Sequence, residues 1–420
     1  GAAGMYCGSC LHDNALAAAL MDLGEDVLLS PIYTPIRTDE TDVSERRVFI
    51  GGVNAYLQQA IPLLRRTPRW LDGWLDRPGV LRLLAGRGAS VDPAKLGAMT
   101  VSMLQGDVGN QRKQIAELVE WLGRDARPDV LHLSNSMMVG LARPIANRCD
   151  CPIVCSLSGE DIFLEKLVEP HYTKARSLLR ERAQDVSAFV ALNQYYADFM
   201  ANYLEVTSDR VHVIPHGLEL NGYEGPAERS QHGPVRIAYL ARICHDKGLH
   251  LLVEACCKLA ERQDLPQFEL HAAGYLGASD RAYLRQIQSS AARMRRRFHY
   301  HGELDRGQKI EFLQAAHIFS TPTIYQESKG LPVLEAWASG AAAVVPDHGA
   351  FSELVVQTGG GLLHAPDDAN DLAEKLGQLL TDPPLTAQLG ESGSVAVKRH
   401  FNAQRMAEQT RNLYRRLLAG

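Results

Sequence analysis

The sequence predicts an α/β protein with two consecutive doubly wound, Rossmann-like parallel-sheet domains that face each other across a cleft. Its 420 residues exceed what one ordinary core holds, because single domains usually contain about 100 to 200 residues. Short apolar runs alternate with helical patterns over nearly the whole length, which is typical of βαβ units. A polar stretch rich in Gly and Pro interrupts this series, and residues 223–234 within it are interpreted as the interdomain linker.

The first domain is expected to span residues 1–222. The chain opens on a turn at residues 1–4, and because a strand should precede such a turn, the first strand is expected to lie upstream of Gly1. Helical patterns lie at 11–23, 109–122 and 139–148. Short apolar runs bounded by turn residues predict strands at 26–31, 129–133, 152–157, 188–192 and 210–214.

The second domain is expected to span residues 235–401, and a further helix at 402–418, within the terminal segment 402–420, is expected to pack back on the first domain. Helices are predicted at 248–262, 281–296, 306–316 and 332–339. Strands are predicted at 235–240, 267–272, 298–301, 318–321 and 342–346.

Composition excludes several classes of protein. The formal net charge of −5 argues against nucleic acid as a partner, because binding to phosphate backbones needs a basic surface. No run of about 18 apolar residues occurs, so no membrane-spanning helix is expected. Several of the eight cysteines lie in apolar runs, which suits reduced, buried thiols of a cytoplasmic protein. Cys7 and Cys10 have C-x-x-C spacing but no partner pair, which favours packing over metal or redox chemistry.

Residues 56–87 form an unusual basic and aromatic segment in the first half. Arginines interleave there with apolar residues and with Trp70 and Trp74, where a compact domain needs only a short connection. The segment is interpreted as a helical insertion with a solvated basic face. The alternative is a cap over a binding site or a peripheral contact with a membrane surface.

The strongest local pattern is a turn between two glutamates, Glu327 and Glu335. Gly330 permits a sharp turn, and Pro332 is a good first residue for the helix that follows, which places Glu335 on its first turn. Backbone amides near a helix N-terminus favour a bound anion. The amides expected to face such an anion belong to Ser328, Lys329, Gly330 and Leu331.

Two carboxylates beside an anion site indicate a ligand that also carries hydroxyl groups. A carboxylate only accepts hydrogen bonds and can take two donors at once, which fits a vicinal diol. A nucleotide sugar supplies a diphosphate, a ribose diol and sugar hydroxyls. Arg242 and Lys247 strengthen this interpretation, because they lie in the loop that follows the predicted strand 235–240. Loops at the carboxyl ends of parallel strands line the ligand site of such folds, and both cations suit phosphate oxygens.

These motifs resemble the retaining, GT-B fold glycosyltransferases of family 4, also called glycosyl transferases group 1. The matching stretches are VHVIPHGLE at 211–219, AYLARICHDKG at 238–248 and STPTIYQESKGLPVLEAWASGAAAVV at 320–345. The resemblance is dense in the second half and thinner in the first, where residues 129–132 resemble a strand of the family.

The resemblance implies a role for each matching residue of the second domain. Arg242 and Lys247 would hold the donor diphosphate, and Glu327 would contact the donor sugar. The amides of residues 328–331 would bind sugar or phosphate, and Glu335 would hold the ribose. In the first domain, on the acceptor side, the turn that contains Gly4 resembles the family's glycine-rich loop, which approaches donor phosphate and acceptor.

The first domain departs from the family at Ser158, where many members carry a histidine near the donor sugar. Glu160 and Asp161 follow, and both are expected to be exposed acids of a loop. The alternative is a role with the acceptor hydroxyl, for which His132 is a further candidate.

The predicted reaction moves a sugar from a UDP-, GDP- or ADP-sugar to a hydroxyl of a glycan, lipid or small molecule, with retention. No D-x-D triplet occurs, so cationic side chains are expected to replace a metal ion, and no cofactor besides the donor is expected. The alternatives are a GT-B sugar phosphorylase or synthase and a catalytically degenerate relative that binds glycans. An NAD-dependent oxidoreductase is disfavoured because the glycine spacing of residues 1–4 differs from the G-x-G-x-x-G that this class needs after a strand.

Overall fold

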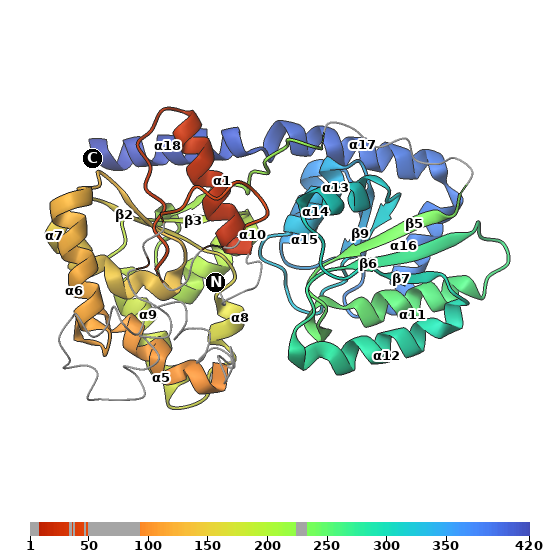
Figure 1. Ribbon diagram of the computed structural model, residues 1–420, viewed down its shortest axis with the longest axis horizontal. Coiled ribbons are helices and arrows are strands. Elements are labelled where there is room, and N and C mark those ends of the chain that lie inside the picture. Colours follow the sequence, from red (N-terminus) through yellow and green to blue (C-terminus); the bar gives the residue numbers. More distant parts are fainter. Residues whose placement is uncertain (1–7, 33–35, 37, 46–47, 49–92, 224–232) are drawn as a thin grey trace. The chain divides into compact units, whose positions relative to one another are not determined.

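The computed structural model describes most of the chain (Figure 1). The glycine-rich loop with Gly4, the basic and aromatic segment 56–87 and most of the linker 223–234 lie outside the described residues. The segments outside the description are 1–7, 33–35, 37, 46–47, 49–92 and 224–232.

The chain divides into two compact units, each with its own parallel sheet. Unit 1 comprises Gly1–Ile214 and Ala407–Gly420, and unit 2 comprises Pro215–Met406. The last helix, α18 (Ala403–Ala419), therefore ends in unit 1. Among the described residues, no helix is both long enough and apolar enough to cross a membrane.

Unit 1 is built on a sheet of four described strands, which are parallel and adjacent in chain order. All four lie within ranges predicted from the sequence. The two central strands are fully buried, because crossover helices cover both faces of a parallel sheet. The strands are β1 (Leu131–Leu133), β2 (Ile153–Ser156), β3 (Ala188–Ala191) and β4 (Val211–Val213).

The helices of unit 1 begin and end where local sequence dictates. Asn193, which follows β3, is an example of an N-cap. Its side chain accepts a hydrogen bond from the Tyr196 amide at the start of the next helix. The main helices are α1 (Gly8–Asp22), α5 (Pro93–Leu104), α6 (Arg112–Trp121), α7 (Ala142–Cys149), α8 (Asp161–Leu164), α9 (His171–Ala183) and α10 (Gln194–Leu204).

The strand predicted at 26–31 is wrong, since this segment forms no ladder with the described sheet. Its Leu29 carbonyl instead accepts a hydrogen bond from the Glu45 amide at 2.8 Å. Asn14 of α1 holds the segment that precedes Glu45, because its side chain donates to the Thr41 carbonyl and accepts from the Val43 amide. The segment has a residue pattern typical of a strand. A strand also needs a neighbouring strand whose backbone pairs with its N–H and C=O groups.

Unit 2 contains a parallel sheet of six described strands in the order β10-β9-β8-β5-β6-β7. Five of them coincide with predicted strands, whereas β10 was not predicted. The strands are β5 (Val235–Leu240), β6 (Phe268–Ala273), β7 (Phe298–Tyr300), β8 (Ile318–Phe319), β9 (Ala342–Pro346) and β10 (Gly361–His364).

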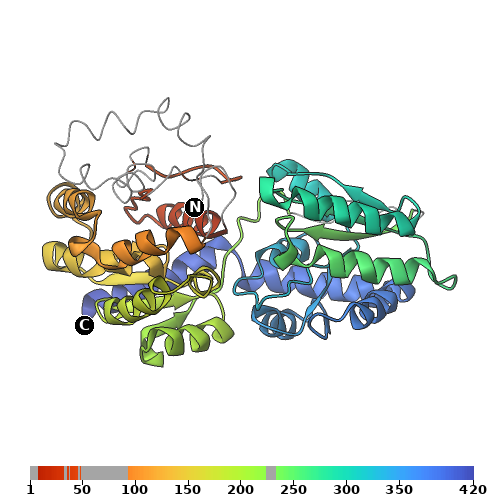
Figure 2. The same cartoon turned by 90° about the horizontal axis from the view of Figure 1, so that it is seen from below.

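Two helical layers cover the two faces of this sheet (Figures 1 and 2). Alternate residues of β5 face opposite cores: Ile237 and Tyr239 pack on one side, and Ala238 and Leu240 on the other. The first side is covered by α11 (Leu249–Ala260), α12 (Arg281–Ala291) and α16 (Ala369–Thr381). The second is covered by α13 (Arg306–Gln314), α14 (Leu331–Ala338), α15 (Ala350–Thr358) and α17 (Pro383–His400).

The order of these strands locates the ligand site of unit 2. The first strand, β5, lies between β6 and β8, so the chain moves one way along the sheet and then returns to the other side of β5. Ligands of doubly wound sheets bind outside the carboxyl ends of the strands at such a reversal. The loops that follow β5 and β8 meet there, and they contain Lys247 and Glu327.

Candidate active site

Lys247, Tyr325 and Glu327 form a bonded cluster at this reversal point. The Lys247 Nζ atom lies 2.8 Å from Glu327 Oε2. The Tyr325 hydroxyl donates to the same carboxylate oxygen at 3.0 Å and also contacts the Lys247 ammonium. Two residues that the sequence placed 80 positions apart are therefore brought into direct contact.

Burial and charge fix the ionisation of this cluster. Glu327 is buried, and burial alone would raise its pKa, but the Lys247 charge and the hydrogen bonds from Lys247 and Tyr325 lower the pKa to about 2. Burial alone would lower the pKa of Lys247, yet the Glu327 carboxylate reverses this effect and raises it. Both groups are therefore charged at neutral pH, as a paired ammonium and carboxylate.

The loop after β5 is held by a tyrosine from the strand itself. The Tyr239 side chain is buried, and its hydroxyl lies 3.3 Å from the carbonyl oxygens of both Arg242 and Lys247. One hydroxyl thereby closes the turn that presents the two cations. The rigid strand thus sets the position of the loop backbone.

The loops after β5 and β8 are joined through their backbones. The Ile324 amide donates to the Asp246 carbonyl at 3.1 Å. Gly248 approaches Pro322 so closely that a Cβ atom at residue 248 would lie 1.6 Å from the Pro322 carbonyl oxygen. Its φ of +73° is also one that favours glycine. The contact between Lys247 and Glu327 therefore rests on a backbone junction that admits no side chain at residue 248.

The turn before α14 donates backbone hydrogen bonds to the Glu327 carboxylate. Gly330 has a φ of +69° and is the N-cap residue that precedes the helix. The amides of Ser328 and Lys329 donate to Glu327 Oε1 at 3.2 and 3.3 Å. The sequence assigned these two amides to a bound donor, together with those of Gly330 and Leu331. Their role toward a donor stays a prediction, because Glu327 accepts both hydrogen bonds in this structure.

Glu335 lies in a different local setting from the one predicted. It is the fifth residue of α14 (Leu331–Ala338) and therefore lies beyond the first turn, because the helix begins one residue before Pro332. Its carboxylate is buried and forms an ion pair with Lys309 of α13, with 2.5 Å between Nζ and Oε1. Any ribose that Glu335 binds must share the carboxylate with this ammonium.

Arg242 projects from the end of β5 and remains about half exposed. Its Nη2 atom lies 3.1 Å from Asp280 Oδ2, and 49% of its side chain is accessible. Asp280 immediately precedes α12. The guanidinium is thus held by one carboxylate while it remains open to solvent, as a group that receives a phosphate must be.

In unit 1, His132 of β1 bridges two neighbouring elements. Its Nδ1 lies 2.6 Å from the Tyr414 hydroxyl of α18, and its Nε2 lies 2.9 Å from Ser156 Oγ of β2. Burial lowers the pKa of His132 to about 4, so the imidazole is neutral. Both ring nitrogens thereby join β1 to its surroundings, and the acceptor-side role of His132 stays a prediction.

The expectation that Glu160 is an exposed acid is wrong. Glu160 is buried, and its carboxylate accepts hydrogen bonds from the backbone amides of Ser136 at 2.7 Å and Ser158 at 2.6 Å. Asp161 is partly buried and accepts a hydrogen bond of 2.6 Å from the Tyr196 hydroxyl, while burial raises its pKa. The segment is polar because the Glu160 carboxylate pairs with two backbone amides and Asp161 pairs with a tyrosine hydroxyl, and local sequence indicated neither set of partners.

Four further residues of this region were not identified from the sequence. Tyr325 lies two positions before Glu327 and was visible within the quoted motif. His216 was also visible in a quoted motif; it is buried, and burial followed by the nearby Lys329 charge lowers its pKa to about 3. Asp280 and Lys309 had no sequence signal, because each becomes a partner only through folding.

Two family models match consecutive parts of the chain. The model described as Glycosyltransferase Family 4 matches residues 98–221, and the model described as Glycosyl transferases group 1 matches residues 226–395. Together they cover more than half of the sequence. The chain belongs to the family 4 glycosyltransferases. It is therefore a transferase of glycosyl groups, and the fold expected from the resemblance is confirmed.

The chain is also similar to curated relatives that are named as synthases. The chain is 25% identical to a glycogen synthase of Mycobacterium tuberculosis over 298 residues, 69% of each chain. It is 31% identical to an alpha-maltose-1-phosphate synthase of Mycolicibacterium smegmatis over 245 residues, which are 53% of this chain and 61% of the relative.

Solved structures share the two-domain GT-B fold. A sucrose-phosphate synthase from Thermosynechococcus elongatus matches with a TM-score of 0.62 and 20% identity, over 74% of this chain and 79% of that one. HepE from Anabaena, solved in complex with UDP, matches with a TM-score of 0.61 and 19% identity, over 74% and 84% of the two chains.

Proposed function

We propose that this glycosyltransferase moves a sugar from a nucleoside diphosphate sugar to an acceptor hydroxyl, with retention at the anomeric carbon and without a catalytic metal ion. The observation that carries the proposal is the ion pair of Lys247 and Glu327 at the reversal point of the unit 2 sheet. A buried carboxylate suits sugar hydroxyls, and an adjacent ammonium suits phosphate.

Arg242 and Lys247 are proposed to stabilise the leaving nucleoside diphosphate. Negative charge builds on this group as the glycosidic bond breaks through an oxocarbenium-like state. A preorganised donor at such a position typically lowers the barrier by about 3 kcal/mol. Tyr239 fixes the carbonyls of both residues, so the loop need not reorganise as charge develops.

Glu327 is proposed to position the donor sugar through its hydroxyls. Its pKa of about 2 keeps the carboxylate ionised and therefore a strong hydrogen-bond acceptor. Such a low pKa also makes it unsuited to act as a general acid at neutral pH. Glu335 is proposed to accept hydrogen bonds from the ribose diol beside Lys309, and the amides of residues 328–331 to contact sugar or phosphate.

The donor is tested by thermal unfolding with UDP, GDP and ADP and with their glucose and mannose conjugates. UDP compounds come first because HepE was solved with UDP. A ligand that binds only the native state at 100 times its Kd stabilises it by about 2.7 kcal/mol. We expect one base to raise the melting temperature. A flat response to all of them would instead favour a catalytically degenerate, glycan-binding relative.

Transfer is then followed with the selected donor in EDTA. Acceptors include a sugar 1-phosphate, because the name of one relative is alpha-maltose-1-phosphate synthase. Full activity in EDTA and an α-configured product from an α-linked donor are expected, read from the anomeric proton coupling over the first turnovers. Strict dependence on added Mn²⁺ would refute the metal-free reaction, and an inverted product would refute retention.

A further inference from the structure

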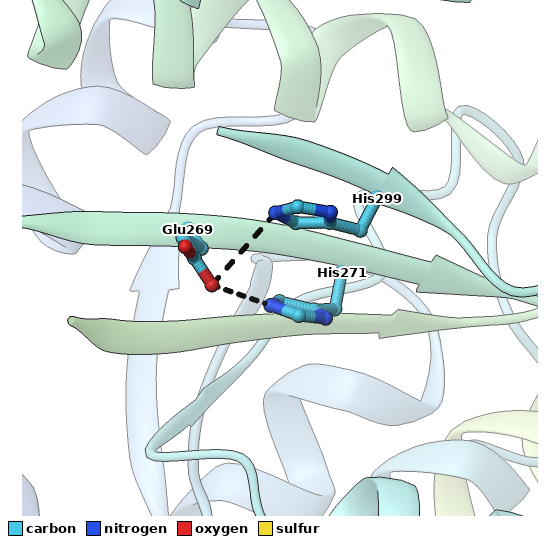
Figure 3. A group of neighbouring side chains, drawn as sticks. All are labelled: Glu269, His271 and His299. Carbon is cyan, nitrogen blue, oxygen red and sulfur yellow. Dashed lines mark hydrogen bonds and ion pairs between the residues drawn. The ribbon is translucent and has the colours of Figure 1, made fainter. Parts of the chain in front are cut away.

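A second polar cluster lies on strands β6 and β7 of unit 2 (Figure 3). It contains Glu269 and His271 of β6 and His299 of β7, and one oxygen or nitrogen atom of each lies within 4.8 Å of the others. The Glu269 Oε2 atom lies 3.0 Å from His271 Nε2 and 3.8 Å from His299 Nε2. Both rings thus turn an Nε2 atom toward a single carboxylate oxygen.

Strand register explains why the three side chains share a face. His271 is the direct partner of His299 in the parallel ladder, and Glu269 precedes His271 by two residues. Opposite residues and residues two apart point to the same side of a sheet. This is the side covered by α13, since Phe312 of that helix contacts the neighbouring His301 ring. Glu269 is the second residue of β6, so the cluster lies away from the carboxyl edge that holds Lys247 and Glu327.

The spacing of these atoms fits ligands of one metal ion. Zinc bonds to imidazole nitrogen and carboxylate oxygen are about 2.0 to 2.2 Å long, and a tetrahedral arrangement separates neighbouring ligand atoms by about 3.3 to 3.5 Å. The two measured separations, 3.0 and 3.8 Å, lie on either side of that value. We propose that Glu269, His271 and His299 bind a divalent transition metal ion, with zinc as the best match, and leave a fourth position for water.

His299 provides a second observation for this site. Its Nε2 atom is buried but makes no hydrogen bond to any residue that the structure describes. The distance of 3.8 Å to Glu269 is too long for a hydrogen bond. A buried polar atom without a partner carries a free-energy cost. A shared metal ion satisfies this nitrogen and the carboxylate oxygen together.

His301 supports the site from the side opposite the proposed ion. Its Nε2 atom lies 2.9 Å from His271 Nδ1, and the two rings stack with centroids 5.1 Å apart. When His271 binds a metal through Nε2, its Nδ1 carries the proton and donates to His301. Metal-binding histidines commonly have such an outer partner, which fixes ring orientation and tautomer.

The ion would join an edge strand to the sheet interior. β7 has three residues and pairs only with β6 among the described strands. An edge strand is hydrogen-bonded to the sheet along one side only. A metal bound by His299 on β7 and by Glu269 and His271 on β6 would cross-link the two strands. Its role is therefore structural, and glycosyl transfer at the opposite end of the strands would not require it.

The test uses the full chain without a histidine tag, stripped with a chelator and titrated with Zn²⁺ against a chromophoric competitor. One tight equivalent per chain is expected, together with a rise in melting temperature. Co²⁺ should give the visible absorption of a four- or five-coordinate ion. His299→Ala and Glu269→Gln should each weaken binding by at least about tenfold, since even an outer-shell change costs about 10- to 100-fold.

Two variants separate this site from adventitious surface binding. His400→Ala removes an exposed histidine of α17 and should leave Zn²⁺ affinity unchanged. Arg236 is the register partner of Glu269, so Arg236→Gln removes a nearby positive charge and should tighten binding severalfold. The proposal is overturned if the wild type shows no tight equivalent, or if His400→Ala loses as much affinity as His299→Ala. Circular dichroism of each variant checks that it is folded.

Discussion

Glu160 and Glu327 are both buried carboxylates in loops that follow parallel strands, yet their partners differ. Glu160 accepts hydrogen bonds from the backbone amides of Ser136 and Ser158, and its Oε2 atom also lies 3.4 Å from the Tyr196 hydroxyl, so that these partners are all uncharged groups. Glu327 also accepts two amides, but its other oxygen faces the Lys247 ammonium and the Tyr325 hydroxyl. A carboxylate held mainly by backbone fixes a loop. One paired with a cation can in addition exchange partners with a charged, hydroxyl-rich ligand.

The largest effect is expected from Glu327→Gln, which keeps the shape of the side chain and removes its charge. We expect kcat to fall by about 10² to 10³ with the selected donor, as when one preorganised group is lost from an active site. Initial rates at saturating donor measure this. The matched control is Glu160→Gln, for which kcat should change by only a few-fold.

If Glu160→Gln lost as much kcat as Glu327→Gln while both stayed folded, the two carboxylates would not differ in function. The acceptor-side role of Glu160 that the sequence left open would then be favoured. Product analysis with two acceptors of different size would show whether the lost step involves the acceptor.

Lys247→Met is expected to lower the free energy of unfolding by about 3 kcal/mol, because it leaves a buried carboxylate without its counterion. The Lys247 and Glu327 side chains are 21% and 10% exposed, so solvent screens the pair only in part. Lys247→Met combined with Glu327→Gln should recover most of this stability without recovering turnover. Chemical denaturation of both variants measures the coupling; strictly additive losses would contradict a direct pair.

Acid should remove the contribution of Glu327 to stability. The pKa of Glu327 is lowered from 4.5 to about 2, so its stabilisation is complete above pH 4.5 and is lost as the pH falls through 2. The contribution is on the order of 3 kcal/mol. The difference in melting temperature between wild type and Glu327→Gln should therefore shrink from about pH 5 toward pH 3. A constant difference over this range would contradict the lowered pKa.

Glu160→Gln is expected to lower the free energy of unfolding by about 1 to 3 kcal/mol. The amide side chain offers one carbonyl oxygen where the carboxylate offered two acceptors, so the amide of Ser136 or Ser158 stays unpaired. Urea denaturation measures the loss. An unchanged midpoint would mean that the loop retains both hydrogen bonds through rearrangement or water.

Continuous apolar runs made the fold predictable, whereas partners distant in sequence made parts of the site unpredictable. β5 and β9 match the predicted ranges residue by residue, because β9 is an uninterrupted apolar segment and Arg236 is the one charged residue in β5. β10 was missed because it begins with glycine and has only two leucines as its apolar residues. The polar segment around Glu160 was interpreted as an exposed loop, since its partners are brought to it only when the sheet of unit 1 forms.

The same distinction applies within unit 2. Arg242, Lys247 and Glu327 follow strands whose carboxyl ends are readable from the sequence, so their common location could be predicted. Lys309 pairs with Glu335, although it lies 26 positions earlier in the sequence and on a different helix, α13. No local periodicity connects those two residues, and only the packing of α13 against α14 brings them together.

The smallest effect is expected from Asp280→Asn, which tests how Arg242 is held. The pair with Arg242 is partly exposed, so the unfolding free energy should change by less than about 1 kcal/mol. Asp280 and a donor diphosphate compete for the same guanidinium, and removing the carboxylate charge should lower the donor KM about two- to threefold at unchanged kcat.

Arg242→Ala should instead raise the donor KM, by about tenfold or more, since a charged hydrogen bond contributes about 1.5 to 3 kcal/mol. A higher KM in both variants would mean that Asp280 positions Arg242 for the donor, and an unchanged KM in both would exclude Arg242 from the diphosphate site.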